Sequence, residues 1–217
     1  AGLRGCTASF VSADGLMLTN HHCAHGMLAR NSTPARNVLA DGFVARARAD
    51  ELPGQGAVVY VFLRQTDVSK RVLAQVPEGL DDEARARALE GIETALVAEC
   101  EQQPDVRCAI SRENDGLRFA LMENLELRDV RVVAAPPESL GSFGGSVDNW
   151  RWPRHTLDFS LLRAYVGPDG RPAAFDQANV PYRPKRFLEV GTRAPAPGDL
   201  IMVAGKPGRT RRYETAD

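Results

Sequence analysis

The strongest constraint on the fold is a series of short segments rich in β-branched and aromatic residues, separated by turns that contain glycine or proline. Residues 56–68 ("GAVVYVFLRQTDV") form the clearest of these segments. Residues 7–19 alternate around an Ala-Asp-Gly turn, which predicts a β-hairpin. We expect further strands within four other segments: 117–136, 158–173, 187–191 and 199–208. Such a series is typical of a β-barrel or β-sandwich.

One long segment breaks this pattern. Residues 81–103 begin with acidic residues and continue with alanine and leucine, and their apolar positions recur at helical spacing on one face. The residues on that face are Leu89, Ile92, Leu96 and Cys100. We also expect one or two helical turns in 21–30 and a polar loop over 31–54. The prediction is therefore a mainly β fold with an inserted helix.

Composition excludes some classes of partner. The chain has 217 residues, of which 43% are hydrophobic and 25% charged, with a net charge of -1. This balance gives no electrostatic reason to expect a nucleic-acid partner, and no apolar run approaches the ~20 residues that span a bilayer. We expect neither nucleic-acid binding nor membrane insertion, and we expect a signal peptide to have been removed.

Four cysteines allow two disulfides. They are Cys6, Cys23, Cys100 and Cys108, and composition alone leaves three pairings open. An even number of cysteines is compatible with an oxidising compartment.

The candidate chemistry begins at "LTNHHC", residues 18–23. His21, Cys23 and His25 could hold a metal ion, because imidazole and thiolate are zinc ligands, although neighbouring side chains diverge and the spacing fits no common zinc pattern. Alternatively, one histidine could act as a base for a nucleophile, oriented by a carboxylate. The residues of this stretch leave both interpretations open.

A cysteine directly after a histidine, beyond an apolar hairpin that begins with another cysteine, resembles the histidine region of chymotrypsin-like serine peptidases. This resemblance implies that Cys6 and Cys23 form a disulfide and that His22 is the base. An aspartate that opens an apolar strand, Asp158 in "DFSLL", resembles the carboxylate position of the same peptidases. Cys100 and Cys108 are predicted to form the second disulfide, which would tie the end of the 81–103 helix to "VRCAI".

Three longer motifs resemble the dipeptidyl-peptidase 7/11 family of bacterial serine exopeptidases, peptidase family S46. They are "GCTASFVSADGLMLTNHHCA", "DNWRWPRHTLDFSLLRAY" and "VAGKPGRTRRY". The resemblance implies a chymotrypsin-like double β-barrel with an inserted helical domain, of which residues 1–217 are the N-terminal part. It further implies release of dipeptides from free peptide N-termini without a cofactor, a homodimer, and a periplasmic or cell-surface location in a Gram-negative bacterium.

The same resemblance assigns roles to individual residues. His22 matches the base and Asp158 its carboxylate, while Asn149 and Trp150 match positions that bind the α-amino group of the substrate. Asp148 is an alternative carboxylate, less suited because it lies in a loop and not at the start of a strand.

The nucleophile is the point where the chain departs from the family. The family's serine lies in a "GNSGSP"-like loop that this sequence lacks, and Ser146 in "GGSVDN" is only a partial match. We therefore expect the serine outside this chain and no peptidase activity from the chain alone. A catalytically inactive binding module and a small metal-binding domain are the alternatives.

Overall fold

The structure is a computed structural model that describes residues 1–3, 5–145 and 155–202. Its body is a seven-stranded antiparallel sheet. The central order is β3 (Ser9–Phe10), β4 (Leu16–Thr19), β11 (Ser160–Val166), β10 (Asp129–Ala135) and β5 (Phe43–Val44). Two short strands complete it, β6 (Leu52–Pro53) beside β10 and β12 (Val180–Pro181) beside β11.

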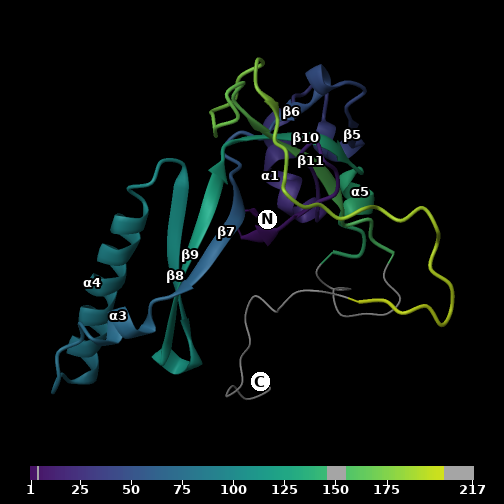
Figure 1. Cartoon of the computed structure of the whole chain (residues 1–217). Coiled ribbons are helices and arrows are strands. Elements are labelled where there is room, and N and C mark those ends of the chain that lie inside the picture. Colours follow the sequence, from purple (N-terminus) through teal and green to yellow (C-terminus); the bar gives the residue numbers. More distant parts are fainter. Residues whose placement is uncertain (4, 146–154, 203–217) are drawn as a thin grey trace.

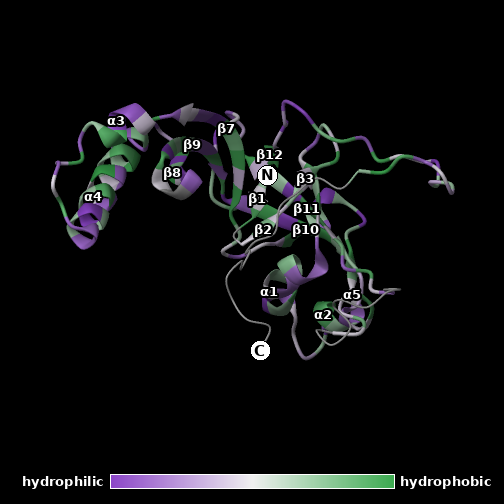
Figure 2. Cartoon of the chain, turned by 90° about the horizontal axis from the view of Figure 1, so that it is seen from below, coloured by the Kyte–Doolittle hydropathy of each residue, from purple (hydrophilic) through white to green (hydrophobic). Residues whose placement is uncertain are grey.

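Helix α1 (His21–Asn31) packs on this sheet and closes the main core. Two one-turn helices, α2 (Val38–Asp41) and α5 (Glu138–Gly141), lie against α1. This core is made of buried apolar side chains. Ala24, Met27 and Leu28 come from α1, and the sheet contributes Phe10, Met17, Val132, Leu162 and Ala164. Figure 2 shows α1 beside β10 and β11, with α2 and α5 next to it.

A second, five-stranded sheet extends from the body as an arm (Figure 1). Its long strands are β7 (Val59–Asp67), β9 (Arg118–Leu127) and β8 (Val106–Glu113), while β1 (Gly2–Leu3) and β2 (Cys6–Thr7) lie at its base. Two helices connect β7 to β8, α3 (Ser69–Leu73) and α4 (Asp82–Cys100), and they enclose a small core of their own. Short 3-10 turns lie at Arg48–Asp50 and Asn114–Gly116.

The predicted fold class is confirmed: the chain is mainly β with an inserted helix. The hairpin, the 56–68 strand and the 81–103 helix are present, and Leu89, Leu96 and Cys100 are buried. The region 117–136 forms two strands, β9 and β10, separated by Arg128 alone.

Three expectations about local structure are wrong. Residues 21–30 belong to a helix of 11 residues, about three turns, where one or two were expected. The 31–54 segment contains α2, β5 and β6 in addition to loop. Residues 187–191 and 199–202 form no strand: Leu188 donates one backbone hydrogen bond to Phe10 of β3, but no further ladder bonds follow it. Residues 203–208 lie outside the described part. None of the described helices is long and apolar enough to cross a membrane.

Candidate functional site

The site forms where β4 ends and β11 begins. These strands are antiparallel neighbours, and Ser160 of β11 pairs with Thr19 of β4. Helix α1 starts two residues after Thr19, and Asp158 lies two residues before Ser160. Because the end of β4 lies beside the start of β11, residues that are far apart in the sequence meet there.

A disulfide holds the first turn of α1. Cys23 in that turn is bonded to Cys6 in β2, with the two Cα atoms 6.2 Å apart. The second disulfide joins Cys100, at the end of α4, to Cys108 in β8. Both predicted pairings are confirmed.

His22 and Asp158 are in direct contact. The Nδ1 atom of His22 lies 2.9 Å from Oδ2 of Asp158 and 3.2 Å from Oδ1. The backbone N–H of His22 also donates to Oδ1, at 3.2 Å. The structure therefore brings together the two residues that the sequence analysis paired.

The electrostatics of Asp158 favour its ionised form. Burial acts to raise the pKa of this carboxyl, but the backbone N–H and the ring of His22 outweigh it, and the pKa is lowered. An ionised carboxylate accepts hydrogen bonds and cannot donate them, so Nδ1 of His22 must carry the ring proton. In the neutral ring this leaves the lone pair on Nε2, which forms no hydrogen bond to any described residue.

His22 and Asp158 differ in how far their side chains are exposed to solvent. The side chain of His22 is 65% exposed, whereas that of Asp158 is 28% exposed. A carboxylate held against the protein and an imidazole open to solvent form a pair that can take a proton from an incoming group and return it.

His21 has a different role. Its side chain is fully buried, and burial lowers its pKa, so the ring is neutral. A Cβ atom placed on Gly141 would lie 2.4 Å from Cγ of His21, which shows that α5 packs closely on this ring. The backbone of Pro136 lies near the ring, but neither ring nitrogen forms a well-aligned hydrogen bond to a described residue. His21 is therefore a packing residue, and His22 is the one that faces Asp158.

The structure gives no support to a metal site built on His21, Cys23 and His25. The sulfur of Cys23 is bonded to Cys6 and is not available as a thiolate. His21 is buried against α5, and Nε2 of His25 lies 3.1 Å from a carboxylate oxygen of Glu138. This bonding and burial explain why three candidate ligands within five residues do not converge.

The remaining predicted site residues, Ser146, Asp148, Asn149 and Trp150, lie outside the described residues. The chain that follows them is anchored on α5. The hydroxyl of Thr156 donates to the carbonyl oxygens of Leu140 and Gly141, and the N–H of Leu157 donates to that of Leu140. This anchor fixes the chain immediately before Asp158.

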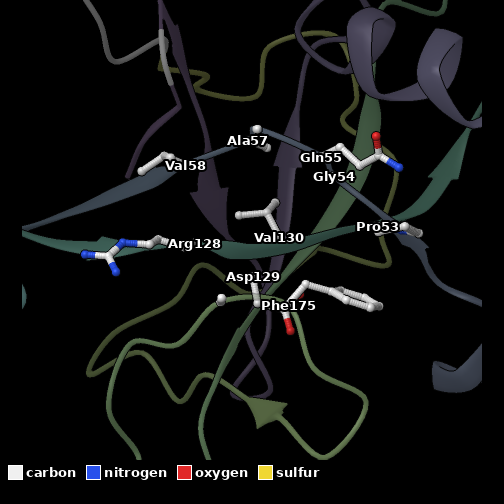
Figure 3. Close-up of a pocket in the computed structure, with 11 residues that line it drawn as sticks. Pro53, Gly54, Gln55, Ala57, Val58, Arg128, Asp129, Val130 and Phe175 are labelled. Carbon is white, nitrogen blue, oxygen red and sulfur yellow. The ribbon is translucent and has the colours of Figure 1, made fainter.

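A cavity of about 510 Å³ lies elsewhere, between residues 53–58, the start of β10 and Phe175 (Figure 3). Its lining is mainly apolar and includes Val58 and Val130. Neither His22 nor Asp158 lines it. The cavity is therefore separate from the candidate site.

Comparison with known proteins gives a consistent result. The family model for peptidase S46 matches residues 2–217. The chain is 43% identical over 213 residues to an Asp/Glu-specific dipeptidyl-peptidase of Shewanella putrefaciens, and 39% identical over 209 residues to a dipeptidyl-peptidase 7 of Capnocytophaga gingivalis. These alignments cover 98% and 96% of this chain but 29% of each relative.

Solved structures agree with the sequence comparison. The chain superimposes on DPP11 of Porphyromonas endodontalis in complex with substrate, with a TM-score of 0.79 and 38% sequence identity. The superposition covers 88% of this chain and 29% of that one. The fold is thus that of the corresponding part of this enzyme, in agreement with half of a double-barrel domain. The chain belongs to the peptidase S46 family.

Proposed function

We propose that this chain supplies the base and its orienting carboxylate to a serine-type dipeptidyl peptidase, which releases dipeptides from peptides with a free N-terminus. The observation that carries the proposal is the 2.9 Å contact between Nδ1 of His22 and Asp158, with Nε2 left open. The names of the S46 relatives, which are dipeptidyl-peptidases, support the reaction class.

In this mechanism Nε2 of His22 removes the proton from a serine hydroxyl as the serine oxygen attacks the carbonyl carbon. His22 then gives that proton to the leaving amine, and water repeats the sequence to release the dipeptide. Asp158 stays ionised throughout and stabilises the imidazolium that forms. The sequence has no "GNSGS"-like loop and spans 29% of its relatives, so we place the serine outside these 217 residues.

Asn149 and Trp150 are proposed to bind the α-ammonium group of the substrate. An amide oxygen accepts a hydrogen bond from an ammonium group, and an indole ring attracts a cation through its face. Recognition of this group would fix the distance from the N-terminus to the cleaved bond, which is what limits the product to a dipeptide. The support is the "DNWRWP" match to the family.

We further propose a homodimer in the periplasm or on the cell surface of a Gram-negative bacterium. Two disulfides support an oxidising compartment, since such bonds are rare in reducing cytoplasm. The dimer rests on the family resemblance.

The test uses the protein at the length of its relatives and fluorogenic dipeptide substrates, one acidic and one without an acidic residue. We expect hydrolysis of peptides with a free N-terminus and none of N-acetylated ones. His22→Ala should reduce kcat by about 10³-fold or more. His25→Ala is the matched control, because His25 lies on the same helix and contacts Glu138 instead of Asp158.

Two outcomes would contradict the proposal. Equal loss in the His22 and His25 variants would show that the helix and not the base was damaged. Binding of peptides without any hydrolysis would favour the inactive binding module. The 217-residue chain alone should be inactive; turnover by it that is lost in His22→Ala would place a nucleophile within it.

A further inference from the structure

Asn20 is placed as a helix N-cap but does not act as one. It directly precedes α1 and has extended backbone angles, φ -76° and ψ 155°. Asparagine in this position normally accepts a hydrogen bond from an N–H of the first helical turn. Here the side chain makes no such bond. By contrast, Asn37 at the start of α2 accepts from the N–H of Ala40 in the usual way.

The amide of Asn20 is turned toward Asp158. Its Nδ2 atom donates to Oδ2 of Asp158 at 3.1 Å and to the backbone oxygen of the same residue at 3.2 Å. Asp158 in turn takes over the capping role, because its Oδ1 atom accepts the N–H of His22. The two residues have thus exchanged roles. Asp158 caps α1, and Asn20, which is 138 positions away in the sequence, bonds to Asp158 and not to the helix.

This exchange ties the carboxylate to the turn that carries the imidazole. Oδ2 of Asp158 has two donors, His22 Nδ1 and Asn20 Nδ2, and Oδ1 has the backbone N–H of His22. All three donors come from residues 20–22. If the amide of Asn20 were removed, the carboxylate could turn about its own side-chain bonds and its distance to Nδ1 would no longer be fixed.

We propose that Asn20 is a positioning residue, which holds the Asp158 carboxylate against Nδ1 of His22 and so keeps Nε2 unprotonated and open. This inference deepens the proposed function and rests on it for its kinetic consequences. Its structural part, the control of the His22 tautomer, can be measured without any peptidase activity.

The kinetic test compares Asn20→Ala and Asn20→Asp in the protein at the length of its relatives. We expect Asn20→Ala to lower kcat about tenfold or more with little change in KM, because a positioning residue acts on the catalytic pair and not on substrate binding. Asn20→Asp keeps the size and the capping preference but replaces the donor by a second carboxylate. Its added charge favours the imidazolium, so the acidic limb of the kcat/KM profile should move to higher pH.

Asn37→Ala and Asn37→Asp are the matched controls, since they make the same changes at another helix start, and both should leave kcat and the pH profile unchanged. A rise in KM at constant kcat in the Asn20 variants would overturn the proposal, because it would mark a substrate contact. Unchanged kinetics would overturn it as well. If Asn20→Ala does not fold, the pH profile of Asn20→Asp decides.

The structural test uses ¹⁵N shifts of the histidine rings near neutral pH, in the protein at the length of its relatives and without substrate. The wild type should show His22 mainly as the Nδ1–H tautomer, and Asn20→Ala should increase the Nε2–H form severalfold. A tautomer ratio unaffected by Asn20→Ala overturns the positioning role. A shifted ratio in a protein that hydrolyses no peptide at full length leaves the positioning role intact and shows that the proposed function is wrong.

Discussion

Asp158 keeps its charge through hydrogen bonds and not through exposure. Burial acts to raise its pKa, and the backbone N–H and ring of His22 lower it by more, so the folded pKa is below the ordinary value of 3.8. Protonation of this carboxyl is therefore harder in the folded protein than in the unfolded chain. The resulting stability is fully present above the unfolded pKa and is lost as the pH falls through the folded pKa.

Asp158→Asn removes this pH-dependent contribution. We expect the variant to have a lower Tm than the wild type near pH 6, with the difference narrowing as the pH falls below about 4. Thermal unfolding followed by circular dichroism between pH 7 and pH 2.5 measures it. A difference that stays constant over the acidic range would contradict the assigned direction of the pKa shift.

Gly141 is required by the ring it contacts. A Cβ there would lie 2.4 Å from Cγ of the fully buried His21, and neither group can move freely in the packed core. We expect Gly141→Ala to lower the free energy of unfolding by about 1–3 kcal/mol. Gly91→Ala is the matched control, because Gly91 lies in α4 with nothing near its added Cβ. Denaturant unfolding should show it stabilised by about 0.5–1 kcal/mol; destabilisation of both variants alike would contradict the packing argument.

Among the elements, the two disulfides stabilise different parts of the molecule. Cys100–Cys108 joins α4 to β8 within the arm, whereas Cys6–Cys23 joins β2 to the helix that carries His22. Replacing Cys100 and Cys108 by serine should cost about 2–3 kcal/mol in the chain-entropy model. The loss should appear as faster amide hydrogen exchange in α4 and β8, with exchange in α1 and kcat nearly unchanged.

The matched control is the double replacement of Cys6 and Cys23 by serine, which opens a loop with a sequence separation of 17. It should speed exchange at the start of α1 and lower kcat, because Cys23 is adjacent to His22. Equal effects of the two double variants on kcat would show that the arm and the site are not independent in the way that the two cores suggest.

The elements also show how far the sequence alone could lead. Two long segments were predictable because their signals are local: the β-branched, apolar run at 56–68 and the helical spacing of apolar residues at 81–103. The His22–Asp158 pair was predictable only through the resemblance of their two motifs to a known peptidase family, and the structure adds that the motifs flank neighbouring strands. The strand expected at 187–191 is absent because its pairing with β3 stops at one backbone hydrogen bond, from Leu188 to Phe10, and local sequence does not reveal where a ladder continues. Asn20 was missed as a site residue because asparagine is a common helix N-cap. Only the structure shows that its side chain points to Asp158.

At the scale of the whole molecule, a cluster of buried charges lies close to where the arm meets the body. Strand β9 of the arm and β10 of the body are separated by Arg128 alone, and Asp129 opens β10. Asp129 is buried and binds the guanidinium of Arg131 through two hydrogen bonds, 2.6 and 2.9 Å long. That guanidinium lies over the rings of Tyr165 and Phe175 at 3.9 and 4.7 Å.

This cluster reaches the connection between β11 and β12 as well. Arg131 donates to the backbone oxygen of Asp176, and Nδ2 of Asn179 donates to Asp129 and to the backbone oxygen of Ala174. Beside it, Glu51 accepts from Arg163 and from the hydroxyl of Tyr165, and burial raises the pKa of Tyr165 to about 12. The buried pair of Asp129 and Arg131 therefore links β10 to residues 174–179 through hydrogen bonds on both of its members.

Breaking this pair on one side should therefore destabilise the body strongly. Asp129→Ala leaves the guanidinium of Arg131 buried without its partner, and we expect a loss of about 3–5 kcal/mol in the free energy of unfolding. Glu83→Ala is the control, since it breaks an exposed pair with Arg87 on α4 and should cost less than about 1 kcal/mol. The double replacement Asp129→Leu and Arg131→Met should recover much of the stability, because it removes both charges and fills the space with apolar groups. Urea unfolding of the three variants measures this, and a double variant no more stable than Asp129→Ala would show that the cluster acts through its shape and contacts to residues 174–179, and not through the balance of its two charges.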